Sequence, residues 1–361
     1  MKSLVASLVG LAVVLAGAAA SEGQVPNVFN MSSGQTSLQF VAVGNPGNAA
    51  DTTVMQDGTT GYGSLPYTYK MGTYDVTLGQ YTAFLNAVAK IDTYGLYNTG
   101  MGSYFPTLGI QQSGSSGNYS YSVTGSYSQA VNCPAFDVSW GDAARFCNWL
   151  QNGQPTGAEG NGTTETGAYT LSGATTTAAL MAITRNANAT YFIPSENEWY
   201  KAAYYGPTLN GGAGGYWTYP TKSNTTPSNL LSTTGTNNAT YWNDSFTDPT
   251  NYLTPVGYFA GSPGPYGTYD MSGDVWQWNE ANLDGSSRGL RGGSFGTFPG
   301  DLPSSCRNGS SPSYDGGLMG FRVASSAATP EPGSITLLVA GAAGLLGYKW
   351  ATRRRKAARI G

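Results

Sequence analysis

FDVSWGDAARFCNWLQNG, residues 136–153, predicts a strand that runs directly into a helix. Ser139 stands at the junction, where a hydroxyl side chain can cap the free N–H groups of the first helical turn. Four apolar residues then share one helical face, which predicts packing against a core: Trp140, Ala144, Cys147 and Leu150. FIPSENEWYKAAYY, residues 192–205, repeats the arrangement, because Ser195 and Glu198 form a capping box before an aromatic-rich helix.

Two strands and a further helix precede this stretch. Residues 36–51 alternate into a strand that stops at an Asn-Pro-Gly-Asn turn, and residues 67–77 predict a second strand. Thr77 then caps a helix with one apolar face: Tyr81, Phe84, Leu85 and Val88. A Gly/Ser/Tyr-rich insertion follows at 94–130, and residues 206–325 lack a helical period, which predicts short strands and ordered loops.

Residues 37–326 contain neither a linker nor a repeat, so we expect one irregular, loop-rich α+β domain with little regular secondary structure. The chain has 361 residues, of which 51 are glycine and only 10% are charged, typical of an uncharged extracellular surface. It contains no histidine, which excludes Ser-His-Asp and Cys-His catalysis and any His-ligated zinc or iron site.

Seven different stretches follow one another between Tyr69 and Ala324: YKMGTYDVTLGQYTAFLNA, FDVSWGDAARFCNWL, IPSENEWYKAAYY, TPVGYF, YGTYDMSGDVWQWNE, LRGGSF and GFRVA. In this order and rough spacing they closely resemble the formylglycine-generating enzyme (sulfatase-modifying factor) family. The resemblance covers most of the exported chain and implies an irregular α+β fold related to C-type lectins. It also implies that the oxidases of the family hold copper on a cysteine pair shortly after Gly-Gly-Ser.

Copper chemistry is not expected in this chain. Gly292-Gly293-Ser294 is followed by residues 295–302 without a cysteine, and Cys306 has no second cysteine near it in sequence. Copper(I) favours two soft thiolates, which Thr and Leu cannot replace. We therefore expect no copper, iron or zinc site, and whether any enzymatic activity remains is left open. An oxidoreductase-type enzyme of altered chemistry would have these candidate residues: Arg291, Ser294, Cys306 and Arg307.

The segment from Arg291 to Arg322 keeps the residues that frame, by resemblance, the family's cleft for a partner peptide. Between them it carries apolar anchors with adaptable polar neighbours, which favours recognition of an exopolysaccharide or a surface peptide. The expected ligand-binding residues are Phe295, Phe298, Asn308 and Tyr314. Phe295 and Phe298 have an equally good alternative, because large apolar side chains are most often buried in a core.

A structural calcium ion is the cofactor that we still expect from the resemblance. Family members hold Ca²⁺ near a Gly-Asn-Val-Trp-Glu-Trp stretch, where this chain has Asp274 for the Asn and Gln277 for the Glu. Asp274 would strengthen such a site and Gln277 would weaken it, because Ca²⁺ prefers charged oxygen ligands. A second site would use Asp244, Asp248 and Asn251. Solvated turns around a packed pair of tryptophans are an equally good alternative.

Three cysteines are an odd number for an exported protein, so at least one is expected to be free or to pair between molecules. Cys147, on the apolar face of its helix, is expected to be a small buried residue. Pairing of Cys133 with Cys306 or of Cys147 with Cys306 stays open. A reactive-thiol role for Cys306 beside Arg307 is a minor alternative.

Both ends of the chain predict export. Residues 1–20 form a signal peptide for the Sec translocon, and residues 21–36 a flexible lead-in. Residues 329–361 combine Pro-Glu-Pro, a short apolar run and a basic tail, and closely resemble the PEP-CTERM sorting signal. Its defining residues are Pro330, Glu331, Pro332, Arg353, Arg354 and Arg355. This resemblance implies cleavage by an exosortase.

The expected location follows from these two signals. The chain would be anchored transiently in the inner membrane of a Gram-negative-type bacterium and would then reach the cell surface or the extracellular matrix. A retained single-span anchor is the alternative. Without both ends the domain keeps about half as many basic as acidic residues, so no nucleic-acid partner is expected. The leading functional hypothesis is a non-catalytic surface protein that binds a ligand or has a structural role.

Overall fold

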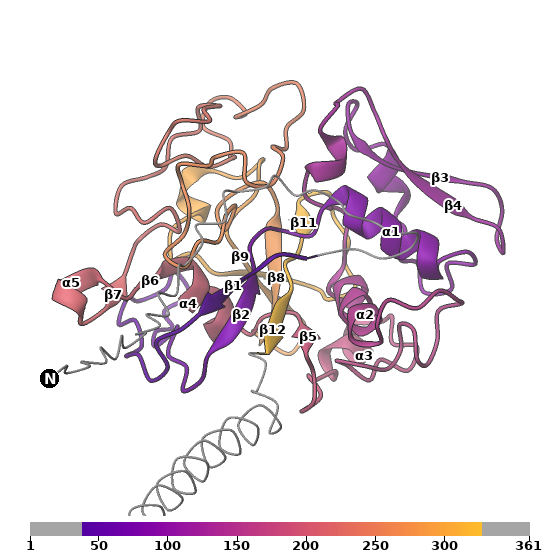
Figure 1. Ribbon diagram of the computed structural model, residues 1–361, viewed down its shortest axis with the longest axis horizontal. Helices are drawn as coiled ribbons and strands as arrows, with labels where there is room; N and C mark the ends of the chain where they lie inside the picture. The colour runs from indigo at the N-terminus through magenta and orange to yellow at the C-terminus, as the bar shows by residue number, and fades with distance from the viewer. Residues whose placement is uncertain (1–37, 327–361) are drawn as a thin grey trace, which may run out of the picture.

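A computed structural model describes residues 38–326 (Figure 1). The predicted signal peptide, lead-in and sorting signal lie outside these residues. The described chain is mixed α and β, with short elements joined by long loops, which confirms the predicted fold class. Within residues 38–326 no helix is long and apolar enough to cross a membrane.

The first sheet joins the two ends of the described domain. Its four strands lie in the order β1-β2-β12-β5, and each pairs antiparallel with its neighbour. They are β1 (Phe40–Val43), β2 (Tyr69–Gly72), β12 (Ala324–Ser326) and β5 (Tyr191–Phe192). Because β12 lies between β2 and β5, the last described residues are held in the centre of this sheet. The strands predicted within 36–51 and 67–77 are confirmed as β1 and β2.

The second sheet carries the Gly-Gly-Ser stretch. Its order is β10-β9-β8-β11, in which β8 and β9 form an antiparallel pair with a register shift and β11 runs parallel to β8. The strands are β8 (Trp276–Asn282), β9 (Arg288–Arg291), β10 (Asn308–Ser310) and β11 (Met319–Gly320). The segment between Arg291 and Arg322 thus leaves β9, returns as β10 and ends just after β11.

The three predicted helices begin at their predicted caps. They are α1 (Leu78–Val88), α2 (Trp140–Gln151) and α4 (Glu196–Tyr204). Thr77, Ser139 and Ser195 each accept a hydrogen bond from the backbone three residues later, and each position-three side chain bonds back to the cap. These capping boxes satisfy N–H groups that would otherwise lack partners.

The predicted apolar face of α2 is buried, and so is its opposite face. Every residue from Trp140 to Leu150 is buried, including Asp142, Arg145 and Asn148. The loop at 160–174 causes this, because it covers the polar side of the helix. Asn148 donates to the carbonyls of Thr164 and Tyr169, at 2.7 and 3.0 Å.

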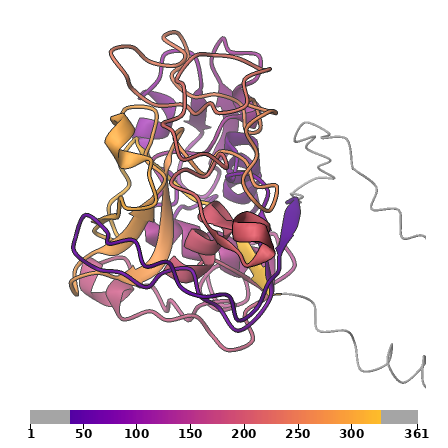
Figure 2. The ribbon, with the colours of Figure 1, turned by 90° about the vertical axis from the view of Figure 1, so that its left-hand side faces the viewer.

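The remaining elements are short. The insertion at 94–130 contains the hairpin β3 (Gly109–Ser113) and β4 (Ser120–Thr124), whose strands lie beside α1 (Figure 1). The others are η1 (Thr99–Gly102), η2 (Ala130–Asn132), α3 (Thr177–Met181), β6 (Tyr205–Gly206), α5 (Leu209–Gly212), β7 (Gly215–Tyr216) and η3 (Pro299–Asp301). The chain between β7 and β8 consists of loops, as the lack of a helical period predicted, and Figure 2 shows these loops at one end of the molecule.

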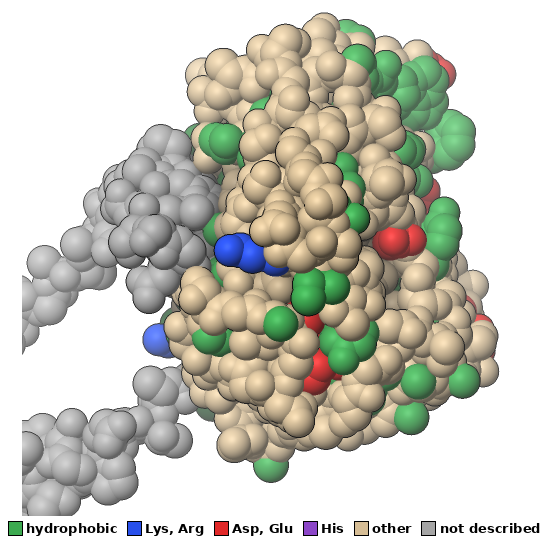
Figure 3. All heavy atoms as spheres, turned by 90° about the vertical axis from the view of Figure 1, so that its right-hand side faces the viewer, with side chains coloured by type: hydrophobic (Ala, Val, Ile, Leu, Met, Phe, Trp, Pro, Cys, Tyr) green, Lys and Arg blue, Asp and Glu red, His purple; other side chains and the backbone are tan. Residues whose placement is uncertain are grey.

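The three cysteines are free and buried, so neither of the two pairings that the sequence left open forms. Cys147 is fully buried in α2, which confirms its predicted role as a small core residue. The surface has few charges, as the composition indicated. Figure 3 shows a face on which uncharged atoms dominate and only scattered acidic and basic side chains appear.

Candidate functional site

Two glycines set the geometry after β9. Gly292 and Gly293 have φ values of 97° and 74°, which side-chain-bearing residues rarely adopt. A Cβ on Gly292 would lie 2.8 Å from the carbonyl oxygen of Met271, so the backbones approach too closely for any larger residue. The chain turns inward here and buries Ser294, whose Oγ has no hydrogen-bond partner.

Arg291 is an internal anchor. It is fully buried, and its Nε lies 2.5 Å from Glu196 Oε1 at the start of α4. Its Nη1 donates to the carbonyls of Ser304 and Cys306, which fixes the returning loop. Because these groups belong to the fold, the guanidinium is not free to meet a substrate.

Arg322 is the internal anchor at the other end of the segment. It is fully buried and forms an ion pair with Asp75, at 3.1 Å between Nη2 and Oδ1. Its Nε donates to Gln277 Oε1 at 2.7 Å, and its Nη1 donates to the carbonyl of Gly72 at 2.8 Å. The two arginines that frame the segment therefore fix its ends to the rest of the fold through buried bonds.

Cys306 is a protected thiol. It is 4% exposed and donates weakly to Asp301 Oδ1, at 3.7 Å from Sγ. Burial and the adjacent Asp301 carboxylate raise the pKa of the Cys306 thiol to about 12. The thiolate is the form that attacks substrates or binds metals, and it is scarce at neutral pH. The minor alternative of a reactive thiol is therefore not supported by these surroundings.

The other two catalytic candidates are Arg307, which shares the Glu196 carboxylate with Arg291, and Ser294. Arg307 is partly buried and pairs with Asp57 and Glu196, at 3.1 and 3.4 Å. Ser294 Oγ, without a partner, is bonded to neither Arg307 nor Cys306. The four candidates are close in sequence, but they do not form a nucleophile and base pair.

The expected ligand-binding residues divide into core and surface. Phe295 is 5% exposed and contacts the rings of Tyr104 and Phe105, which favours the alternative that it is a core residue. Phe298 and Tyr314 are 66% and 53% exposed. Asn308 is also exposed, but its Oδ1 accepts from the backbone of Gly309.

The predicted calcium residues are buried and already hydrogen-bonded. Asp274 Oδ1 and Oδ2 accept from the backbone N–H and the hydroxyl of Thr254, each at 2.8 Å. Gln277 Oε1 accepts from Trp199 Nε1 and Arg322 Nε, so this oxygen is occupied and does not fit a calcium ligand. Calcium binding stays a prediction that rests on Asp274. In the second predicted site, Asp248 closes a turn with Asn251 instead.

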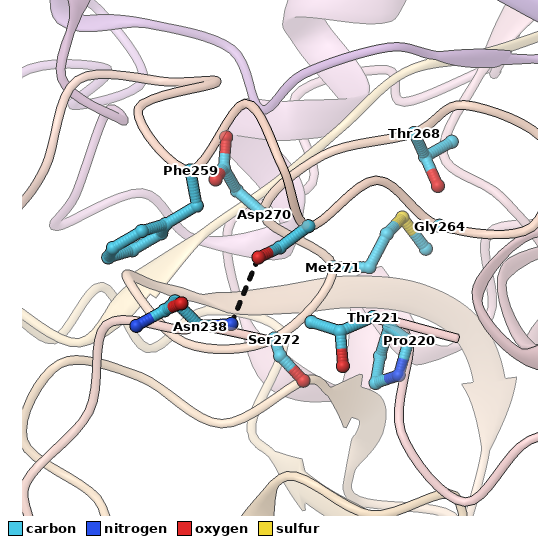
Figure 4. Close-up of a pocket in the computed structure, with 10 residues that line it drawn as sticks. Pro220, Thr221, Asn238, Phe259, Gly264, Thr268, Asp270, Met271 and Ser272 are labelled. Carbon is cyan, nitrogen blue, oxygen red and sulfur yellow. Dashed lines mark hydrogen bonds between the residues drawn. The ribbon is translucent and has the colours of Figure 1, made fainter. Parts of the chain in front are cut away.

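A small polar cavity is lined by Asp270, Met271 and Ser272, just before Asp274 in the sequence (Figure 4). Its volume is about 10 Å³, near the lower limit for one water molecule. The buried hydroxyls of Thr268 and Ser272 line it without partners, and the backbone N–H of Asn238 donates to Ser262 Oγ on its wall, at 2.9 Å. One water or one cation would satisfy the orphaned hydroxyls.

Sequence reasoning missed the buried charges outside this segment. Arg185 lies between Glu198 and Glu280, at 2.7 and 2.6 Å, and Asp137 is buried with an unpartnered Oδ2. Glu198 was noticed only as a capping residue. The signal for these residues is a charged side chain within an apolar stretch. In a chain that is only 10% charged, such a side chain is expected to be buried with an oppositely charged partner.

Comparison with sequence families decides the relationship. The family described as "Sulfatase-modifying factor enzyme 1-like domain" matches residues 41–327, well over half of the chain. The chain belongs to this family. No curated protein matches the sequence.

Several solved structures are similar to this member of the sulfatase-modifying factor family. CarF shares 19% identity over 81% of this chain and 99% of its own, with a TM-score of 0.44. PvdO from Pseudomonas aeruginosa shares 19% over 84% and 100%, with a TM-score of 0.44. Treponema denticola variable protein 1 shares 17% over 82% and 98%, with a TM-score of 0.45.

The copper site of the family's oxidases does not fit the thiols of this member. Cys133 Sγ contacts the carbonyl of Gln129 at 3.7 Å, Cys147 lies inside α2, and Cys306 lies beside Asp301. Within residues 38–326 no three His, Cys, Asp or Glu side chains gather as metal ligands. A dithiolate for copper(I) would need two of these separated, protonated thiols to meet.

Proposed function

We propose that this domain is a non-catalytic binding module that uses the sulfatase-modifying factor scaffold at the cell surface. One observation carries the proposal. Residues 295–302, where an oxidase of the family needs a pair of cysteines, contain none, and the next thiol along the chain, Cys306, is buried and held protonated beside Asp301. The framing arginines support it, because both are bonded inside the fold.

An aerobic peptide assay tests the non-catalytic part. The purified protein is supplied with copper and a sulfatase-type Cys-X-Pro-X-Arg peptide, and aldehyde is measured by mass spectrometry. We expect none above a no-enzyme control. Aldehyde formation that disappears in Cys306→Ser would overturn the proposal, since it would show that the thiol is reachable and reactive.

The binding part rests on the exposed residues between the two arginines. Phe298 and Tyr314 are large apolar side chains left in solvent, and Asn308 lies in the same segment. Exposed aromatic side chains with adaptable polar neighbours suit recognition of an exopolysaccharide or a surface peptide. Tyr314→Ala should weaken binding to extracted exopolysaccharide without a large change in Tm. Leu230→Ala, at a residue 70% exposed outside the segment, is the matched control and should bind normally.

Export is the third part of the proposal and rests on the two chain ends. The intact mass of protein released from the cell surface should correspond to a chain that begins near Ser21 and ends near Pro332. Deletion of residues 353–359 should leave precursor in the inner membrane, because the basic cluster holds the tail in the cytoplasm. Mature surface protein that retains Trp350 would contradict an exosortase signal.

A further inference from the structure

A second cavity lies on the first sheet, and none of its lining residues belongs to the Arg291–Arg322 segment. It has a volume of about 340 Å³, within the range of small-ligand pockets. It is lined by Tyr67, Thr68, Tyr69, Arg185, Asn186, Ala187, Ala189, Phe192, Glu198 and Ser326. These residues come from the start of β2, from β5 and the loop before it, from α4 and from the end of β12.

The charges at this cavity disfavour an anionic ligand. Arg185 is the cation of the cluster, and it faces two carboxylates, Glu198 and Glu280, at 2.7 and 2.6 Å. Its Nη2 also donates to the carbonyl of Ile193, and the guanidinium stacks on Phe192 at 3.6 Å from the ring centre. A phosphate, sulfate or carboxylate would meet an excess of negative charge and a guanidinium that is already bonded.

The same bonds disfavour a cationic ligand. Glu198 Oε1 accepts from Arg185 Nη1 and Tyr67 Oη, each at 3.0 Å. Glu198 Oε2 accepts from Arg185 Nη2 at 2.7 Å and from the backbone of Ser195 at 2.6 Å. Both oxygens are saturated and the side chain is fully buried. Glu280 is also bonded, because its Oε1 accepts from Tyr169 Oη and Arg185 Nε and its Oε2 accepts from Arg185 Nη2. A cation would therefore approach Arg185 without gaining an unbonded carboxylate oxygen.

What remains on the wall is an aromatic surface edged by hydroxyls. Tyr67 is 44% exposed, yet its hydroxyl is held by Glu198 and its ring packs edge-on against Tyr69 at 6.4 Å. The exposed residues Thr68 and Ser326 add hydroxyl groups. A fixed, half-exposed tyrosine offers contact area at little cost in conformational entropy. The ring of a sugar has the matching chemistry, with an apolar C–H face and hydroxyls at its rim.

We infer that this cavity binds one ring of a neutral saccharide, which stacks on Tyr67 and bonds to the surrounding hydroxyls. This inference goes beyond the proposed function, because it uses a different set of residues and names the charge class of the ligand. It excludes uronic acids, sulfated sugars and amino sugars with a free ammonium group from the cavity.

Ligand-observed NMR on the purified full-length protein tests this. The neutral probes are cellobiose, maltose and N,N′-diacetylchitobiose, and the charged probes are glucuronic acid and glucosamine. We expect saturation transfer to at least one neutral disaccharide and to neither charged sugar. Ala187→Trp fills the cavity from an exposed position and should reduce the signal at least tenfold, while the Tm stays unchanged.

Two further variants assign the contact. Tyr67→Ala should weaken the same probe about tenfold or more, and Tyr314→Ala, in the segment of the proposed function, should leave its binding unchanged. Failure of all neutral probes to bind, or unchanged binding in Ala187→Trp, overturns the inference. Loss of binding in Tyr314→Ala alone would place the sugar in the Arg291–Arg322 segment, which overturns this inference and supports the proposed function.

Discussion

Asp137 is held in a backbone conformation that acidic residues adopt only occasionally. Its φ is 54°, in the left-handed region, and the residue is 4% exposed. Its Oδ2 has no hydrogen-bond partner. Burial, together with the nearby Asp315 carboxylate, raises the pKa of Asp137 to about 7. The folded state therefore favours the protonated form of the Asp137 side chain and disfavours its charged form.

Asp137→Asn is expected to stabilise the domain at high pH. The raised pKa means that the folded state holds its proton more tightly than the unfolded chain does. The resulting stability is present below the ordinary pKa of Asp and is lost as pH rises toward 7. Asn tolerates the left-handed region and carries no charge. Urea unfolding should show a gain on the order of 2 kcal/mol at pH 8 and little change at pH 4. An equal effect at both pH values would contradict this account.

At the scale of elements, the helix caps were predictable from local signals, but the strand predicted just before Ser139 is wrong, because residues 136–138 form no strand. The caps Thr77, Ser139 and Ser195 were visible because a capping box is contained within four residues. The burial of Arg145 depends instead on the loop at 160–174, and no local pattern connects them. Phe295 could not be assigned to core or surface, since its neighbours Tyr104 and Phe105 lie about 190 residues earlier in the chain.

The pair of Arg145 and Glu165 fixes that loop to α2. Arg145 Nε lies 2.7 Å from Glu165 Oε1, and the two side chains are 1% and 3% exposed. Arg145 Nη2 also donates to the carbonyl of Ala174, and Glu165 Oε2 accepts from the backbone of Gly173. Removal of one partner leaves a buried, uncompensated charge. Arg145→Met should therefore lower the free energy of unfolding by about 3–5 kcal/mol.

A double variant and a variant at a surface ion pair test whether the buried charge causes this loss of stability. Arg145→Met combined with Glu165→Gln should recover much of the loss, because the remaining buried charge is gone. Asp57→Ala breaks a pair with Arg307 in which Asp57 is 37% exposed, and it should cost less than about 1 kcal/mol. Urea unfolding measures all three. If the double variant is as unstable as Arg145→Met, the loss comes from packing around the Arg stem rather than from charge.

At the scale of the whole molecule, the core contains more acid than base near the second sheet. Asp75 and Asp274 are buried, Asp270 is partly buried, and the three lie close enough to affect one another, with Arg322 as the neighbouring cation. Burial raises the pKa of Asp75 to about 8, despite its pair with Arg322, and that of Asp270 to about 6. Burial and Asp270 raise the pKa of Asp274 well above its ordinary value. Arg322 supplies one positive charge for three carboxyl groups, so the folded state favours their protonated forms.

The cluster predicts that the domain becomes less stable as pH rises. It also predicts that the effect of calcium on stability depends on pH. Carboxyls with raised pKa values stabilise the fold when protonated, and this stability is lost as pH rises from about 4 to 8. Glu198 acts in the opposite sense, because its bonds to Arg185 lower its pKa despite burial. The Tm should therefore fall between pH 5 and pH 8. Calcium bound at Asp274 should raise the Tm at pH 8, where that carboxyl is more often charged, and have little effect at pH 5. Asp274→Asn should abolish the calcium effect. A Tm at pH 8 that is the same with calcium and with chelator would exclude a calcium site at Asp274.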